Sequence, residues 1–158
     1  MRILVTGDRK WSGLSVMAEV LSEYPKGTTL IHGYASGADT MADVIGQELG
    51  FEIIRCPAHW SHNCKLWVEV YGECPPDCKE MFGRPAGVIR NQFMLEKHNP
   101  ELILAFHNDI DNSRGTKDMV RRAQKRGIPF KLYDESGLRK IWMPMPKRSD
   151  GIKSEATD

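Results

Sequence analysis

Short apolar segments alternate along this chain with segments of helical periodicity. The apolar segments occupy residues 2–6, 28–32, 51–56, 101–106 and 128–133, and each has the length of a strand buried on both faces. Apolar residues recur at helical spacing over residues 14–24, 38–49, 86–98 and 116–126. This alternation predicts an α/β fold in which helices cover both faces of a parallel sheet. Because crossovers are right-handed, we expect a Rossmann-like, doubly wound sheet of about five strands in the order 3-2-1-4-5.

The domain organisation follows from the length and from where the alternation stops. With 158 residues, 41% of them apolar, the chain can bury one core. We expect one domain over residues 1–133, with an irregular insert at 57–85 after the third strand. Residues 134–158 are expected to form a C-terminal extension that contains a short helix at 138–142 and a flexible polar tail.

The charge pattern limits the classes of partner. Twenty-two basic and 21 acidic residues give a net charge of +1, which argues against a surface devoted to nucleic acid. Four basic residues in segment 121–126 are interpreted as a solvated helix face. No apolar run approaches the roughly 18 residues that span a bilayer, and the N-terminal residues lack a secretory signal pattern. We therefore expect a cytoplasmic protein with no membrane partner, and homo-oligomerisation stays open.

The loop after the first strand carries three candidate ligand contacts. In a doubly wound sheet, ligands bind beyond the carboxyl ends of the strands, where the strand order reverses. Gly7 permits a tight turn, Arg9 offers a guanidinium to a phosphate, and Trp11 offers a ring to a base. The alternative is a solvated basic turn whose tryptophan covers the sheet edge.

The loop after the second strand combines small residues with the start of a helix. Gly33, Ser36 and Gly37 would expose backbone N–H groups there, and the helix dipole favours an anion. Asp39 follows as a further candidate, and Tyr34 offers a second aromatic ring. Alternatively, Ser36 and Asp39 form a capping box and touch no ligand.

A similar loop follows the fourth strand. Ser113, Gly115 and Thr116 open a helix and are suited to holding a phosphate, although Ser113 also fits a simple N-cap. Arg90 and Asn91 fall near the start of the helix at 86–98. A positive charge is unfavourable at a helix N-terminus, so Arg90 either faces an anionic ligand or a buried carboxylate, or is a surface arginine.

The insert contains a cluster of potential metal ligands. His62, Cys64, Cys74 and Cys78 would suit a closed tetrahedral zinc site, with His59 as an alternative to His62. A structural zinc would order a long insert that lacks a core of its own. The alternative is that reduced cysteines pack as small apolar groups. Zinc is the one cofactor that we expect.

Four segments together resemble a known family. GDRKW (7–11), HGYASGADTMA (32–42), AGVIRNQFM (86–94) and SRGTKDMVRRAQKRGIP (113–129), in this order and spacing, resemble the YspA/YpsA-like branch of the SLOG (SMF/DprA–LOG) superfamily. The resemblance implies a pocket for a nucleotide or a nucleotide derivative. The positions matching the family's motifs are Gly7, Arg9, Gly33, Gly37, Asp39, Arg90, Asn91, Gly115 and Thr116.

One departure from the family bears on catalysis. The LOG phosphoribohydrolases carry a Gly-Gly-x-Gly-Thr-x-x-Glu signature, and here Met119 occupies the position of the glutamate. Asp118 lies one residue earlier, which on a helix is a rotation of about 100°. We therefore expect a sensor or sequestering module that binds an anionic, ADP-ribose-like nucleotide derivative without turnover. The alternatives are a LOG-type hydrolase that cleaves the N-glycosidic bond of a nucleoside monophosphate, and a DprA-like binder of single-stranded DNA.

Overall fold

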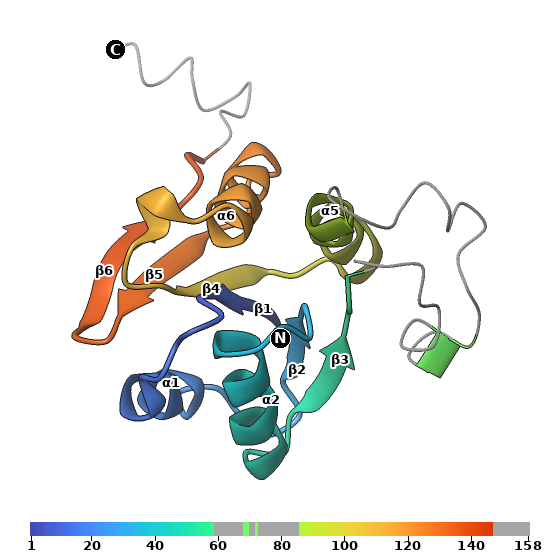
Figure 1. Ribbon diagram of the computed structural model, residues 1–158, viewed down its shortest axis with the longest axis vertical. Helices are drawn as coiled ribbons and strands as arrows, with labels where there is room; N and C mark the ends of the chain where they lie inside the picture. The colour runs from blue at the N-terminus through green and yellow to red at the C-terminus, as the bar shows by residue number, and fades with distance from the viewer. Residues whose placement is uncertain (59–67, 70–71, 73–85, 147–158) are drawn as a thin grey trace, which may run out of the picture.

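A single mixed sheet with helices on both faces forms the described part of the computed structural model, which covers residues 1–58, 68–69, 72 and 86–146 (Figure 1). The strands are β1 (Arg2–Gly7), β2 (Thr29–His32), β3 (Glu52–Arg55), β4 (Leu102–Phe106), β5 (Phe130–Asp134) and β6 (Gly137–Trp142). The helices are α1 (Leu14–Leu21), α2 (Ala38–Glu48), α5 (Ala86–His98) and α6 (Gly115–Lys125), with a 3-10 turn, η1, at Ile110–Asn112.

The strand order is β3-β2-β1-β4-β5-β6, and the first five of these strands run parallel to one another. This confirms the predicted Rossmann-like sheet and its order 3-2-1-4-5. Strand order reverses between β1 and β4, because the chain moves from β1 outward to β3 and then returns to the other side of β1.

The prediction of a short helix at residues 138–142 is wrong. These residues belong to β6, which pairs antiparallel with β5 and so extends the sheet into the expected C-terminal extension. Trp142 stacks on Phe130 with 6.0 Å between ring centroids, and the Lys140 ammonium lies 5.9 Å from the same ring. Ladder hydrogen bonds and cross-strand ring contacts with β5 favour the strand, and neither is visible in local periodicity.

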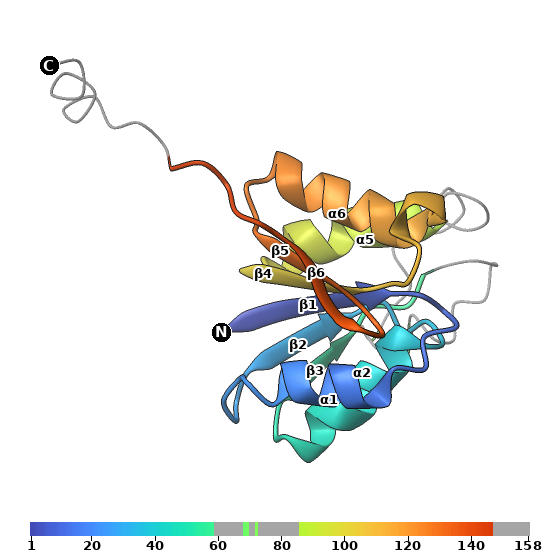
Figure 2. The same cartoon turned by 90° about the vertical axis from the view of Figure 1, so that its left-hand side faces the viewer.

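The helices divide into two layers around the sheet. Figure 2 shows α1 and α2 on one face and α5 and α6 on the other. Each face of the sheet has its own hydrophobic core, and consecutive residues of β1 point to opposite cores. Ile3 and Val5 pack in the cluster under α1 and α2, and Leu4 packs in the cluster under α5 and α6. No helix among the described residues has the length and apolar character to cross a membrane.

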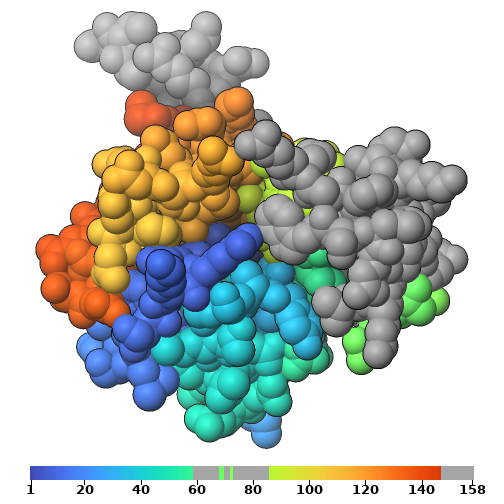
Figure 3. Space-filling view, in the orientation of Figure 1, coloured from blue at the N-terminus to red at the C-terminus, as the bar shows by residue number. Residues whose placement is uncertain are grey.

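The loops at the carboxyl ends of the central strands approach one another closely. A Cβ atom on Gly7 would lie 2.3 Å from the carbonyl oxygen of Phe106 and 2.6 Å from Cβ of Ala38, so only glycine fits there. In the space-filling view, the blue residues after β1 lie between the cyan residues after β2 and the gold residues before α6 (Figure 3). The fold thus gathers three strand-to-helix loops on one face.

Candidate functional site

A cavity of about 1060 Å³ opens at these carboxyl ends, a volume at the upper limit of that typical of small-molecule sites. Residues from all three loops and from α5 line it: Thr6, Gly7, Asp8, Arg9, Lys10, Ala35, Asp39, Gly87, Val88, Arg90, Asn91, His107, Ser113, Arg114, Gly115 and Thr116. The cavity therefore lies where the reversal of strand order leads one to expect a ligand.

Most of the residues proposed from the sequence meet at this cavity. The eight that line it are Gly7, Arg9, Asp39, Arg90, Asn91, Ser113, Gly115 and Thr116. The predicted binding residues leave out eight others that line the cavity. Six of these lie inside the four motif segments, namely Asp8, Lys10, Ala35, Gly87, Val88 and Arg114, and the other two, Thr6 and His107, lie at the ends of β1 and β4. Trp11, Gly33, Ser36 and Gly37 are not among the lining residues.

Trp11 lies in the core, with an exposed fraction of 4%. Its ring meets the ring of Phe106 edge-on, at 5.5 Å between centroids, and its Nε1–H donates to the carbonyl oxygen of Gly13 at 3.2 Å. Burying the large indole against β4 removes it from the cavity, so the stacking role considered for Trp11 does not fit its position. The alternative, a tryptophan that covers the sheet, describes it better.

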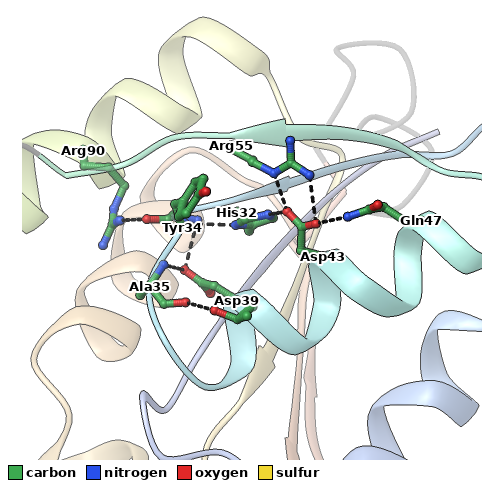
Figure 4. A network of polar contacts seen from close by, with 10 residues as sticks. His32, Tyr34, Ala35, Asp39, Asp43, Gln47, Arg55 and Arg90 are labelled. Carbon is green, nitrogen blue, oxygen red and sulfur yellow. Dashed lines mark hydrogen bonds and ion pairs between the residues drawn. The ribbon is translucent and has the colours of Figure 1, made fainter. Parts of the chain in front are cut away.

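The carboxylate of Asp39 orders the β2–α2 loop. Its Oδ2 accepts hydrogen bonds from the N–H groups of Gly33, at 3.0 Å, and Ala35, at 3.2 Å (Figure 4). The residue before α2 is Gly37, and Ser36 instead donates its hydroxyl to the carbonyl oxygen of Arg9. The predicted capping box of Ser36 and Asp39 therefore does not form, although the Asp39 carboxylate does accept hydrogen bonds from residues that precede it. Burial raises the pKa of Asp39, and the Arg90 charge and the N–H donors offset only part of this effect.

A buried polar network lies behind the same loop. Nε2 of His32 is 2.6 Å from Oδ2 of Asp43, and Arg55 donates two hydrogen bonds to the same carboxylate, at 2.7 and 3.0 Å (Figure 4). Burial raises the pKa of Asp43, but the hydrogen bonds from Arg55, His32 and Gln47 outweigh it and lower the pKa to about 2. Nδ1 of His32 accepts the N–H of Tyr34 at 2.9 Å, which places the ring proton on Nε2. No local motif marked this network, because its members come from three different elements.

Arg90 connects α5 to the end of β2. Its Nη1 donates to the carbonyl oxygen of Gly33 at 2.5 Å and to that of Cys56 at 3.4 Å, and its Nε donates to the side chain of Asn91. A Cβ atom on Gly33 would lie 2.3 Å from Nη1, so this glycine makes room for the guanidinium. Arg90 is therefore a cavity residue with defined partners and not a solvated surface arginine.

Asn91 and Ser113 fix the start of α6 against α5. The amide of Asn91, which is 3% exposed, donates to the carbonyl oxygen of Gly115 and to the carboxylate of Asp118. The hydroxyl of Ser113 accepts the N–H of Thr116 at 3.0 Å, as an N-cap does, so Ser113 both caps the helix and lines the cavity. Asp118 also accepts from Arg122 at 2.9 Å and is not among the lining residues.

The electrostatics of the cavity favour an anion. Among the described lining residues, four carry a positive charge, Arg9, Lys10, Arg90 and Arg114, against the two carboxyl groups of Asp8 and Asp39. First-turn residues of α2, α5 and α6 all contribute to the wall. The first N–H groups of a helix lack acceptors within the helix and carry partial positive charge. Oxyanion groups such as phosphates suit such a site.

The expected zinc ligands His62, Cys64, Cys74 and Cys78 lie outside the described residues. Within the described part of the chain, no group of three or more His, Cys, Asp and Glu side chains is placed to hold a metal ion.

Comparison with known proteins agrees with the pattern of motifs. Residues 1–62 match the YspA, cpYpsA-related SLOG family. Over 133 residues the chain is 32% identical to the Gene 61 protein of Mycobacterium phage D29. The matched region covers 81% of this chain and 92% of that protein. The chain belongs to this SLOG family. The resemblance drawn from its sequence motifs is thereby confirmed.

The SLOG chain also resembles the X-ray structure of DNA processing protein A (DprA) from Streptococcus pneumoniae, with a TM-score of 0.55 and 14% sequence identity. The similarity covers 99% of this chain and 56% of the DprA chain, so the SLOG chain corresponds to about half of that protein. At this identity the similarity shows a shared Rossmann-type fold.

Proposed function

We propose that this protein binds a nucleotide or a nucleotide-derived, ADP-ribose-like anion in the cavity at the carboxyl ends of β1, β2 and β4, and acts as a sensor or sequestering module. One observation carries the proposal: three strand-to-helix loops and the first turn of α5 converge on one cavity with an excess of positive charge. Family membership supports the same class of ligand, since the motif segments that define the resemblance supply much of the wall.

Isothermal titration calorimetry tests the proposal with AMP, ADP-ribose and NAD as probes. Arg9→Ala should weaken binding about ten- to a hundredfold, because it removes a charge-assisted hydrogen bond worth about 1.5–3 kcal/mol. Arg121→Ala is the matched control, because it removes an equal charge from an exposed position of α6 outside the cavity. Equal affinity of the Arg9 variant and the wild type would overturn this site, and absence of binding for all three probes would overturn the ligand class.

Hydrolysis of a nucleotide is a second candidate, favoured by the carboxyl group of Asp39 at the cavity wall. Its raised pKa is the property required of a general acid. Against this candidate, Met119 is buried and Asp118 is engaged by Asn91 and Arg122. Chromatography of AMP incubated with the protein decides the question. Release of free adenine would show that the protein is a phosphoribohydrolase and not a binding module.

The DprA-like fold makes single-stranded DNA a third candidate ligand. Binding governed by phosphate contacts must weaken steeply with salt, so a mobility-shift assay with an oligonucleotide at rising salt identifies it. We expect no shift at physiological salt, since the chain is nearly neutral overall. A tight, salt-sensitive complex would favour the DNA alternative.

A further inference from the structure

The two central strands are followed by the same kind of turn. Asp8 comes directly after β1 and His107 directly after β4, and the last residues of these two strands pair in register. Oδ1 of Asp8 accepts the N–H of Lys10 at 2.9 Å. Nδ1 of His107 accepts the N–H of Asp109, which also lies two residues further along the chain, at 2.9 Å. Each side chain thus supports the backbone of its turn with one polar atom.

Each of the two side chains has a second polar atom that its turn does not use. In Asp8 this atom is Oδ2, an acceptor. In His107 it is Nε2, a donor, because Nδ1 accepts a hydrogen bond and the ring proton therefore lies on Nε2. Within the described part of the chain, no group forms a hydrogen bond or an ion pair with either atom. Asparagine also forms turns of this kind, so the turns alone do not account for a carboxylate and an imidazole.

Both side chains are directed to the side of the sheet where the cavity lies. The ladder continues past the strand ends, since the N–H of Asp8 donates to β4 and that of His107 donates to β5, both at 2.9 Å. Because side chains alternate along a strand, Asp8 shares a face with Leu4, and His107 shares a face with Ala105. Leu4 and Ala105 pack in the core under α5 and α6, the helices that Figure 2 shows together on one face. Asp8 and His107 accordingly line the cavity together with the first turns of these helices.

The two unused atoms offer an acceptor and a donor where the strand order reverses. Neighbouring strands are about 5 Å apart, so one part of a ligand can reach both side chains. A phosphate does not suit this position, because the carboxylate of Asp8 repels a second negative charge. A hydroxyl group both donates and accepts hydrogen bonds, and the ribose of a nucleotide carries two adjacent hydroxyl groups.

We propose that Asp8 and His107 form the subsite for the ribose of the ligand. The carboxylate of Asp8 accepts a hydrogen bond from one ribose hydroxyl, and Nε2–H of His107 donates to the other. The two residues are then specificity residues that select a ribonucleotide over a nucleotide without these hydroxyl groups. This inference rests on the proposed function, because it places one part of the ligand within the same cavity.

The test uses calorimetry with AMP and 2′,3′-dideoxy-AMP, two probes that share the phosphate and the base. The wild-type protein should bind AMP at least about tenfold more tightly, since a hydrogen bond to a charged group contributes at about this level. Asp8→Asn and His107→Asn keep an oxygen for the turn and remove the carboxylate charge or the Nε2–H. Each should reduce the preference for AMP about three- to tenfold. Asp111→Asn is the control, because it removes an equal charge from an exposed residue outside the cavity.

The ratio of the two affinities separates this role from a structural one. A general change in charge or in the fraction of folded protein affects both probes alike and leaves the ratio unchanged. Thermal melting should show both asparagine variants close to the wild type, because the turns keep their acceptors.

Three results would decide against the subsite or the site. A wild-type protein that binds both probes equally would overturn the ribose subsite. A ratio that neither asparagine variant changes would also overturn it, even if both variants lose affinity, because the two residues would then contact another part of the ligand or none. If the wild-type protein binds neither probe, the proposed function itself fails, and this result differs from the other two.

Discussion

Nη1 of Arg90 donates a hydrogen bond to the carbonyl oxygen of Gly33, which lies 57 residues earlier in the chain. The same guanidinium lines the cavity. It therefore joins α5 to the β2–α2 loop and at the same time contributes positive charge to the site. One side chain thus contributes both to the shape of the cavity and to its positive charge.

Replacing Arg90 should affect stability and binding together. Arg90→Ala removes the bonds to Gly33 and Cys56, so we expect a lower melting temperature as well as a ten- to hundredfold weaker affinity for AMP, about 1.5–3 kcal/mol. Arg90→Lys retains the charge and cannot span the same acceptors, so it should recover part of the affinity and little of the stability. Calorimetry and thermal melting measure the two effects. An Arg90→Ala variant that binds AMP normally would contradict a role in the site.

Two glycines at the cavity should respond differently to added side chains. A Cβ atom on Gly115 would meet no atom within 4 Å, so Gly115→Val should fold normally and weaken AMP binding by occupying the position of the phosphate. A Cβ atom on Gly7 would collide with the backbone of Phe106, so Gly7→Ala should lower the free energy of unfolding by about 1–3 kcal/mol. Chemical denaturation and calorimetry distinguish the two outcomes. Strong destabilisation by Gly115→Val would count against the open space at that position.

The carboxyl group of Asp39 should make the protein less stable as pH rises. Because burial raises its folded-state pKa, the stability that its protonated form contributes is complete below pH of about 4 and is lost as pH rises through the folded pKa. Asp39→Asn should remove this dependence and keep an oxygen that accepts the N–H groups of Gly33 and Ala35. It should also bind AMP at least as well as the wild type, since one negative charge leaves the cavity. Denaturation curves at several pH values check the first effect, and a large loss of AMP affinity would contradict the second.

Asp43 should give a pH dependence of the opposite sign. Its folded-state pKa is lowered to about 2, so its contribution to stability is present above pH of about 4 and is lost as pH falls toward 2. The Asp43→Asn variant should be less stable than the wild type near neutral pH, because it loses the ion pair with Arg55. Between pH of about 4 and 2 the variant should lose less stability than the wild type does. Equal acid sensitivity of the wild type and the variant, measured by denaturation, would show that the network does not hold this carboxylate.

We also propose that His62, Cys64, Cys74 and Cys78 bind one structural zinc ion, as their residue types and clustering indicate. Elemental analysis of protein purified without added metal should then give about one zinc per chain. The double variant Cys74→Ser/Cys78→Ser should contain no zinc. Cys56→Ser is the control, because Cys56 lies in the core under α5 and α6. Folded wild-type protein without zinc would refute the proposal.

Much of this fold could be predicted from the periodicity of strands and helices alone. The order of the first five strands was predicted from the alternation of strands and helices, which local sequence shows, together with the general right-handedness of crossover connections. The glycine and arginine positions after β1, β2 and β4 could likewise be placed at one edge of the sheet, because parallel strands end together. Eight of the proposed binding residues line the cavity for this reason.

Tertiary contacts decided what each of those residues does. Trp11 packs in the core because Phe106 and the neighbouring strands cover its indole, which no local pattern reveals. Residues 138–142 form a strand because the edge of β5 supplies hydrogen-bond partners that outweigh a local helical pattern. The pairing of His32 with Asp43 joins a strand to a helix face, and the pairing of Arg90 with Gly33 spans two layers. Periodicity reports which face a residue occupies, whereas hydrogen bonds and burial depend on which distant residues reach that face.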